Sequence, residues 1–213
     1  MIHTCPQRLW YVNDFLIPSM LEQGVEREQI KLWNDEKMVG CLESCMKAFE
    51  SCGKRSDEGV WHMQDDVVIS SDFKEMTEKH DDGIVCGHLF GLHRDMDHHI
   101  GIVTPQQMWF SFPCIRIPNR IAAGCSEWFY DVASKDEQFQ DKIRAKRYDD
   151  TFFNIYVQWF QQNAKITNLV PNIVAHIDYL IGGSVAQDST TAPEIYFTDI
   201  DAIENLKRKL AER

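Results

Sequence analysis

The first 80 residues repeat one unit three times: a short apolar segment, a polar loop and a stretch with apolar side chains at helical spacing. Residues 30–33 alternate like a half-buried strand, and residues 42–49 place apolar side chains at every third or fourth position. The helix of the third unit is expected to begin at Phe73, with Ser71 or Asp72 as its cap. Strands that alternate with helices fold into an α/β architecture. We therefore predict a mostly parallel sheet flanked by helices.

Two adjacent carboxylates, Asp65 and Asp66, follow the apolar segment at residues 60–63. In open α/β sheets, ligands bind at the carboxyl ends of the strands, because the loops there leave a crevice. Mg²⁺ and Mn²⁺ prefer oxygen ligands and are commonly coordinated by substrate phosphates as well as by the protein. The pair therefore predicts a divalent-cation site, and a surface turn rich in Asp is the alternative interpretation.

The composition is typical of a packed globular protein and argues against some classes of binding partner. Its 213 residues are 44% hydrophobic, which is enough for one sizeable core or at most two small ones. A net charge of -11 argues against a nucleic-acid partner, which would require clustered Lys and Arg. No membrane span and no signal peptide are expected from the apolar pattern. The seven cysteines form no Cys-x-x-Cys pair, so we expect free thiols in a reducing cytoplasm rather than a zinc knuckle.

The stretch Gln64-Asp65-Asp66-Val67 resembles the DxD-type signature of GT-A-fold glycosyltransferases, and most of all the EDDV variant of short lipopolysaccharide-type sugar transferases. In that family the acidic motif holds the metal that bridges the diphosphate of a nucleotide-sugar. The resemblance implies that Asp66 is a metal ligand and that Asp65 supports binding of the donor. Gln64 stands where the first acidic residue of the motif would make a metal or ribose contact. Mn²⁺ or Mg²⁺ is the implied cofactor.

Earlier polar residues are similar to the donor-binding loops of the same family. Thr4, Pro6 and Arg8 resemble the loop after the first strand, which contacts the nucleotide. Asp35 resembles the acid at the end of the second strand, which reaches the base or the ribose. Taken alone, Arg8 is an ordinary solvated side chain and Asp35 an ordinary turn residue, and these interpretations stay open.

A second acid pair, Asp149 and Asp150, precedes aromatic residues at helical spacing in residues 152–160. A helix N-terminus favours an ionised carboxylate, so capping explains one of the two acids. The pair also resembles the E/D-D motif of the family, which in inverting members supplies the base that deprotonates the acceptor hydroxyl. Both roles stay open, and Asp150 is preferred over Asp149 as the base.

His176 ends a Pro-x-x-Val-x-His pattern within an apolar run, and a Gly-Gly-Ser turn follows it. A single histidine in an apolar run is commonly a hydrogen-bonded core residue. The pattern is similar to the C-terminal segment of the family, in which a histidine completes the metal shell of several members. The resemblance therefore implies that His176 is the second protein ligand of the metal.

Two other segments carry chemistry-bearing side chains without a clear motif. Residues 91–100 form one polar loop without zinc-type spacing, so we expect a lid or specificity loop rather than a metal site. Residues 108–130 are rich in aromatic side chains, which serve either as core or as a surface for sugar rings. The ligand-type residues of the first segment are His93, Asp95, Asp97, His98 and His99.

We therefore expect a single-domain α/β protein with a GT-A-like fold, whose mostly parallel sheet binds a nucleotide. Residues 1–90 would form the nucleotide-sugar half, residues 91–184 the acceptor and catalytic half, and residues 185–213 a tail with an amphipathic helix. The expected activity is hexosyltransferase-like, from a UDP- or GDP-sugar to a hydroxyl of a glycan or another acceptor. The alternatives are a nucleotidyltransferase of related fold and a non-catalytic carbohydrate-binding or scaffold protein that retains the fold.

Overall fold

The computed structural model describes residues 1–53, 58–89, 101–103, 112–146, 148–181 and 197–213, and it has an α/β fold. The main sheet has seven strands in the order β2-β1-β3-β7-β5-β8-β6, and β4 and β9 form a separate pair. The strands are β1 (Ile2–Thr4), β2 (Leu32–Asn34), β3 (Gly59–Gln64), β4 (Val67–Ile69), β5 (Ile84–Cys86), β6 (Gly101–Val103), β7 (Cys114–Pro118), β8 (Ile166–Asn168) and β9 (Val174–His176).

Most strands of the main sheet run in one direction. β1 is parallel to both β2 and β3, and β5 is parallel to β8. β7 lies antiparallel between β3 and β5, and β6 is antiparallel to β8. The predicted α/β class and mostly parallel sheet are therefore confirmed, with β7 as an antiparallel strand in the middle.

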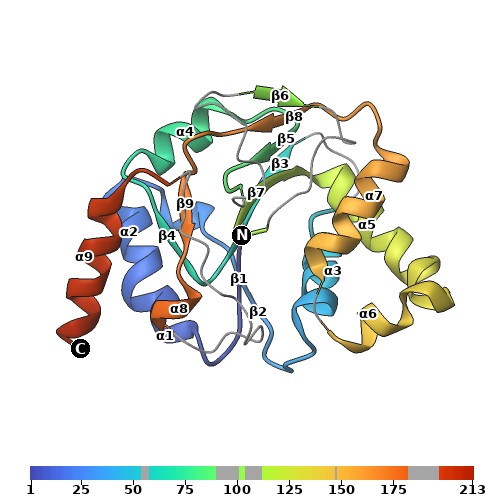
Figure 1. Ribbon diagram of the computed structural model, residues 1–213, viewed down its shortest axis with the longest axis horizontal. Coiled ribbons are helices and arrows are strands. Elements are labelled where there is room, and N and C mark those ends of the chain that lie inside the picture. The colour runs from blue at the N-terminus through green and yellow to red at the C-terminus, as the bar shows by residue number, and fades with distance from the viewer. Residues whose placement is uncertain (54–57, 90–100, 104–111, 147, 182–196) are drawn as a thin grey trace.

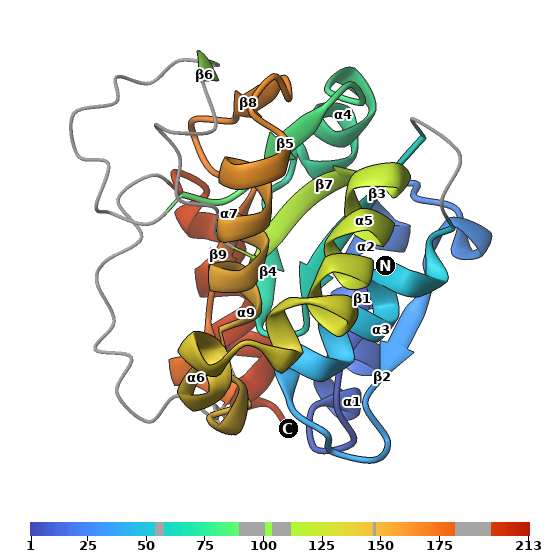
Figure 2. The same ribbon diagram turned by 90° about the vertical axis from the view of Figure 1, so that its right-hand side faces the viewer.

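Helices cover both sides of this sheet. Figure 1 shows α3, α5 and α7 on one side and α1, α2 and α9 on the other, and Figure 2 looks onto the side of α3, α5 and α7. The α-helices are α1 (Leu9–Tyr11), α2 (Ile17–Glu22), α3 (Cys41–Ser51), α4 (Phe73–Lys79), α5 (Asn119–Asp131), α6 (Gln140–Arg144), α7 (Asp149–Phe160), α8 (Asp178–Ile181) and α9 (Ile200–Ala211). Shorter turns are the π-helix η1 (Val12–Leu16) and the 3₁₀ turns η2 (Arg27–Gln29), η5 (Ala133–Lys135) and η6 (Glu137–Phe139).

The strands contribute side chains to two hydrophobic cores, because successive side chains of a strand point to opposite faces of the sheet. In β5, Ile84 and Cys86 pack with α3, α5 and α7, whereas Val85 packs with α1, α2 and the β4–β9 pair. The first core contains the described aromatic residues of the segment 108–130 that are buried, namely Phe112, Trp128 and Phe129. For these three the core interpretation of the aromatic segment is confirmed.

The start of α4 corrects one expectation. The helix begins at Phe73 as predicted, but neither Ser71 nor Asp72 caps it with a side chain. Instead, the side-chain oxygen of Gln23 accepts a hydrogen bond from the N–H of Lys74 at 3.2 Å. The predicted cap is wrong because Asp72 Oδ1 accepts the hydroxyl of Ser70 at 2.6 Å, and one N–H of the first turn has its acceptor in Gln23.

Two broader expectations concern cysteine and membranes. All seven cysteines lie in the described part of the chain, and each is a free thiol. Four of them, Cys45, Cys86, Cys114 and Cys125, are buried. Among the described residues no helix has the length and apolar character that crossing a membrane requires.

Candidate functional site

Three segments converge at the carboxyl ends of β1 and β3. These strands are parallel neighbours, so the turn after β1 and the acids after β3 lie at the same edge. Arg8 closes the turn after β1 through its N–H, which donates to the carbonyl of Cys5 at 3.0 Å. In the small sheet, His176 pairs with Val67, and the N–H of Ile177 donates to the carbonyl of Asp66 at 2.8 Å. The sheet pairing therefore brings His176 beside the acids.

The side chains at this edge form one buried ionic cluster. Arg8 Nη1 donates to Asp65 Oδ1 at 2.8 Å and to Asp66 Oδ2 at 2.5 Å. His176 Nε2 lies 3.1 Å from the same Asp66 Oδ2. Asp65 and Asp66 are each only 6% exposed. The convergence of Asp66 and His176, which the proposed metal site requires, is therefore present.

The protonation of the two acids differs because their partners differ. Burial by itself would raise the pKa of Asp66, but the hydrogen bond and charge of His176, together with the charge of Arg8, lower it to about 2. Burial, and then the charge of Asp66, raises the pKa of Asp65 against the opposing effect of Arg8. Asp66 is thus held as a carboxylate throughout the neutral range.

Asp178 is a member of the cluster that the sequence analysis missed. Its Oδ1 lies 3.7 Å from His176 Nδ1, and the residue is 4% exposed at the start of α8. A carboxylate beside one ring nitrogen orients a histidine, and here the other nitrogen, Nε2, faces Asp66 Oδ2. The spacing His-x-Asp directly before a helix is the sequence signal that would have found it.

The donor atoms at this edge suit a cation that is shared with another ligand. Asp66 Oδ1 is buried, and within the described residues it has no hydrogen-bond partner. No group of three or more His, Cys, Asp or Glu side chains in the described part of the chain is arranged to hold a metal alone. Mg²⁺ and Mn²⁺ are commonly coordinated by one or two protein ligands, and phosphate oxygens and water molecules fill the remaining coordination positions. Asp66 and His176 fit that role.

The other expected donor-loop residues lie around this cluster. Thr4 is buried at the end of β1, and its hydroxyl helps to lower the pKa of Asp65. Pro6 is exposed in the turn before Arg8. Gln64, the last residue of β3, is half-buried, and its N–H donates to the carbonyl of Pro113 at 3.1 Å.

Asp35 lies at the same edge, but its carboxylate forms a turn. One oxygen accepts the N–H of Val39 at 3.1 Å and the other that of Gly40 at 3.0 Å. The turn interpretation therefore accounts for both oxygens. Its neighbour Asn34 pairs with Thr4 in the sheet and has a buried amide oxygen without a partner among the described residues. Asn34 is a second residue that the sequence analysis missed.

The acid pair Asp149 and Asp150 forms a separate cluster at the start of α7. Asp150 Oδ1 accepts the N–H of Thr151 at 2.6 Å, as a helix-terminal acid does. Burial, followed by the charge of Asp150, raises the pKa of Asp149 to about 7. The thiol of Cys41, the first residue of α3, is also within reach of Asp149. The charges that act on Asp149 thus differ from those that act on Asp66.

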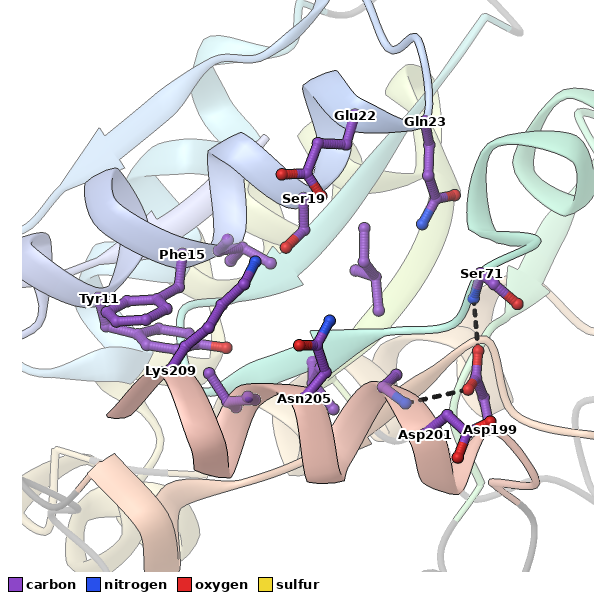
Figure 3. Close-up of a pocket in the computed structure, with 15 residues that line it drawn as sticks. Tyr11, Phe15, Ser19, Glu22, Gln23, Ser71, Asp199, Asp201, Asn205 and Lys209 are labelled. Carbon is purple, nitrogen blue, oxygen red and sulfur yellow. Dashed lines mark hydrogen bonds between the residues drawn. The ribbon is translucent and has the colours of Figure 1, made fainter. Parts of the chain in front are cut away.

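A groove of about 350 Å³ lies between α2 and α9, where Val68 and Ile69 of β4 line it. Figure 3 shows Tyr11 and Phe15 at one end of it and Ser71 with Asp199 at the other. The hydroxyl of Tyr11 donates to the carbonyl of Val67 at 2.7 Å, directly after the acid pair. The groove is therefore a neighbour of the ionic cluster, with its own lining residues.

Comparisons of the chain with protein-family models, with curated proteins and with solved structures find no match. The histidine-rich loop with His93 and His99 lies outside the described residues. The arrangement of Arg8, Asp65, Asp66 and His176 is therefore the main guide to function.

Proposed function

We propose that the protein is a metal-dependent glycosyltransferase with a GT-A-like fold, which moves a sugar from a nucleotide-diphosphate sugar to an acceptor hydroxyl. The observation that carries the proposal is the meeting of Asp66 and His176, with one unpartnered Asp66 oxygen, at the carboxyl edge of parallel strands. The order of elements supports it, since the acids lie between β3 and β4 and the histidine lies on β9, the partner of β4.

Each residue of the cluster has a proposed role in donor binding. Asp66 Oδ1 and His176 Nε2 would hold Mn²⁺ or Mg²⁺ once Nε2 exchanges its proton and its contact with Asp66 Oδ2 for the cation, and Asp178 would orient His176. The bound cation would supply Lewis-acid neutralisation of the charge that develops on the leaving diphosphate. Asp65 positions Arg8, whose guanidinium contacts both acids. Thr4, Pro6, Gln64 and Asp35 would line the nucleotide side.

Asp149 is the better candidate for the acceptor base in an inverting reaction. A general base works best when its pKa lies near the operating pH, and the pKa of Asp149 is raised to about 7. Asp150, the residue preferred from the sequence, already accepts the N–H of Thr151. In Figure 1 the starts of α3 and α7 lie at the lower end of the molecule, where β1 and β2 also end.

Binding of UDP- and GDP-sugars with and without Mn²⁺ tests the proposal by calorimetry and thermal shift. We expect nucleotide-sugar binding only with the metal, and a ligand at 100 times its Kd should stabilise the fold by about 2.7 kcal/mol. Asp66→Asn should weaken the joint binding at least about tenfold, because it removes a charged ligand.

The matched control for this substitution is Asp82→Asn, which removes an exposed carboxylate paired with Lys165. It should leave binding unchanged. Equal binding without metal, or an unaffected Asp66→Asn variant, would contradict the proposal. Release of pyrophosphate from UTP or GTP with a sugar phosphate would instead indicate a nucleotidyltransferase.

A further inference from the structure

Arg8 occupies the position between the two acids that a shared cation would take. A single nitrogen, Nη1, contacts Asp65 at 2.8 Å and Asp66 at 2.5 Å, instead of the forked two-nitrogen geometry that satisfies a guanidinium best. The residue is 8% exposed, and its Nε is buried without a partner among the described residues. The acids are therefore already neutralised in part, by a side chain with an unsatisfied donor.

We propose that Arg8 is a resident counter-ion that keeps divalent metal off the acid pair until a diphosphate arrives, so that metal and nucleotide bind cooperatively. The inference rests on the proposed function and adds the order in which its ligands bind. A divalent ion at Asp66 would lie beside the guanidinium, and like charges repel strongly at a buried site. A diphosphate brings the negative charge and acceptor oxygens that both cations need.

The backbone around Arg8 permits such a transfer of the side chain. Its N–H and carbonyl are held by the turn from Cys5 and by the N–H of Tyr11, at 3.0 Å each. These bonds do not involve the guanidinium, so the side chain can leave the acids while the turn stays in place. Its unpartnered Nε is the donor that a phosphate oxygen would satisfy.

The test measures Mn²⁺ affinity by calorimetry, alone and with saturating UDP or GDP, for the wild type and Arg8→Gln. The wild type should bind Mn²⁺ alone at least tenfold more weakly than with a nucleotide. Arg8→Gln should bind Mn²⁺ alone at least tenfold more tightly than the wild type. The enhancement of Mn²⁺ affinity by nucleotide should shrink toward onefold, because the repelling cation is gone.

Arg8→Lys is the second variant, which keeps the positive charge if Arg8→Gln folds poorly. It should resemble the wild type in Mn²⁺ affinity without nucleotide. Arg144→Gln, on the exposed surface of α6, is the matched control and should change nothing. Unchanged or weaker Mn²⁺ binding by Arg8→Gln, or tight Mn²⁺ binding by Arg8→Lys alone, overturns the inference.

These outcomes separate the inference from the proposed function. Metal-dependent nucleotide-sugar binding by the wild type, with no gain in Mn²⁺ affinity in Arg8→Gln, refutes the role of Arg8 and leaves the transferase proposal intact. Tighter Mn²⁺ binding by Arg8→Gln, without nucleotide binding by any variant, refutes both the transferase proposal and the cooperative binding of metal and nucleotide, although Arg8 would still repel the metal.

Discussion

Ionisation of the Asp149 carboxyl lowers the stability of the folded protein, and substitution of Asp149 should show this effect. Its pKa is raised from 3.8 to about 7, first by burial and then by the charge of Asp150. A raised carboxyl pKa favours the protonated form in the folded state. The associated stability is therefore full below pH 3.8 and is lost as the pH rises through about 7.

Asp149→Asn should remove this loss, since the amide does not ionise. After allowance for the partial exposure of the side chain, we expect a gain of roughly 1 to 2 kcal/mol in unfolding free energy at pH 8 and almost none at pH 4. Urea unfolding of both proteins at the two pH values measures it. Asp150→Ala, which loses the acceptor of the Thr151 N–H, should lower stability instead; the same gain in both variants would speak against a special role for Asp149.

For single residues, the sequence predicts which side chains are candidate ligands more readily than it predicts which residues those side chains contact. The sequence indicates that Asp66 and His176 are candidate ligands, because their motifs are local. The family resemblance implies a nucleotide contact for Arg8, whereas its guanidinium contacts Asp65 and Asp66, which lie between β3 and β4 and are distant in sequence. Asp178 was missed for the same reason, since its role depends on where the ring of His176 points.

Among the connecting elements, the loop that joins β2 to α3 depends on Gly40. Its φ of +106° and ψ of 158° lie in a region that only glycine enters readily. A Cβ there would lie 2.6 Å from the Lys146 Cβ and 2.8 Å from the Lys146 carbonyl oxygen. Its N–H also donates to Asp35. The glycine thus lets the start of α3 meet the chain that leads into α7.

Gly40→Ala should therefore destabilise the protein by about 3 kcal/mol, through backbone strain plus contact with backbone atoms of residue 146. Gly53 is the matched control, because its φ is +80° and a Cβ there would meet nothing within 4 Å. Gly53→Ala should cost only about 1 kcal/mol. Chemical denaturation of the two variants checks the difference, and equal costs would refute the contact with residue 146.

The elements themselves were predicted best where the apolar pattern was long. Periodicity located α3 and β3, and it placed the start of α4 correctly. It could not give the direction of β7, because alternation is the same in parallel and antiparallel strands. Periodicity also could not predict that β4 pairs with β9. Each of these strands has only three residues, and the two strands are distant in sequence.

For the molecule as a whole, the ionic cluster adjoins the core that is formed with α1, α2 and α9. Asp66 is followed directly by Val67, and His176 is preceded by Ala175, both members of the core formed with α1, α2 and α9. The acids are thus held in position by apolar neighbours on the same strands. Composition allows one sizeable core or two small ones, but it does not show that the sheet separates two cores, because this depends on which face each strand presents.

A second buried polar pair extends across two strands and should determine the acid stability of the whole fold. His3 Nε2 and His62 Nδ1 lie 2.8 Å apart on β1 and β3, and the ring of Phe49 packs edge-on against His62. Cys52 Sγ lies 4.0 Å from the other nitrogen of His62. One ring must donate and the other accept, so the bond requires at least one neutral histidine.

Burial, and then the charge of the Met1 amino group, lowers the pKa of His3 to about 3, and burial followed by the charge of His3 lowers that of His62. The unfolded chain binds these protons near pH 6.5, so stability is full above that pH and is lost as the pH falls. From pH 7.5 to 5, each histidine that stays neutral should cost about 2 kcal/mol.

The double variant His3→Gln/His62→Gln should therefore lose less stability over this range than the wild type, although its stability at pH 7.5 is lower. Urea unfolding at pH 7.5, 6 and 5 gives the two slopes. His80→Gln is the comparison variant: His80 lies at the end of α4 outside the pair, and burial lowers its pKa as well, so this substitution should flatten the slope less than the double variant does. Equal slopes for the wild type and the double variant would contradict this prediction. They would mean that the two histidines have the same protonation in the folded and the unfolded protein. The His3–His62 pair would then not be the cause of the acid sensitivity.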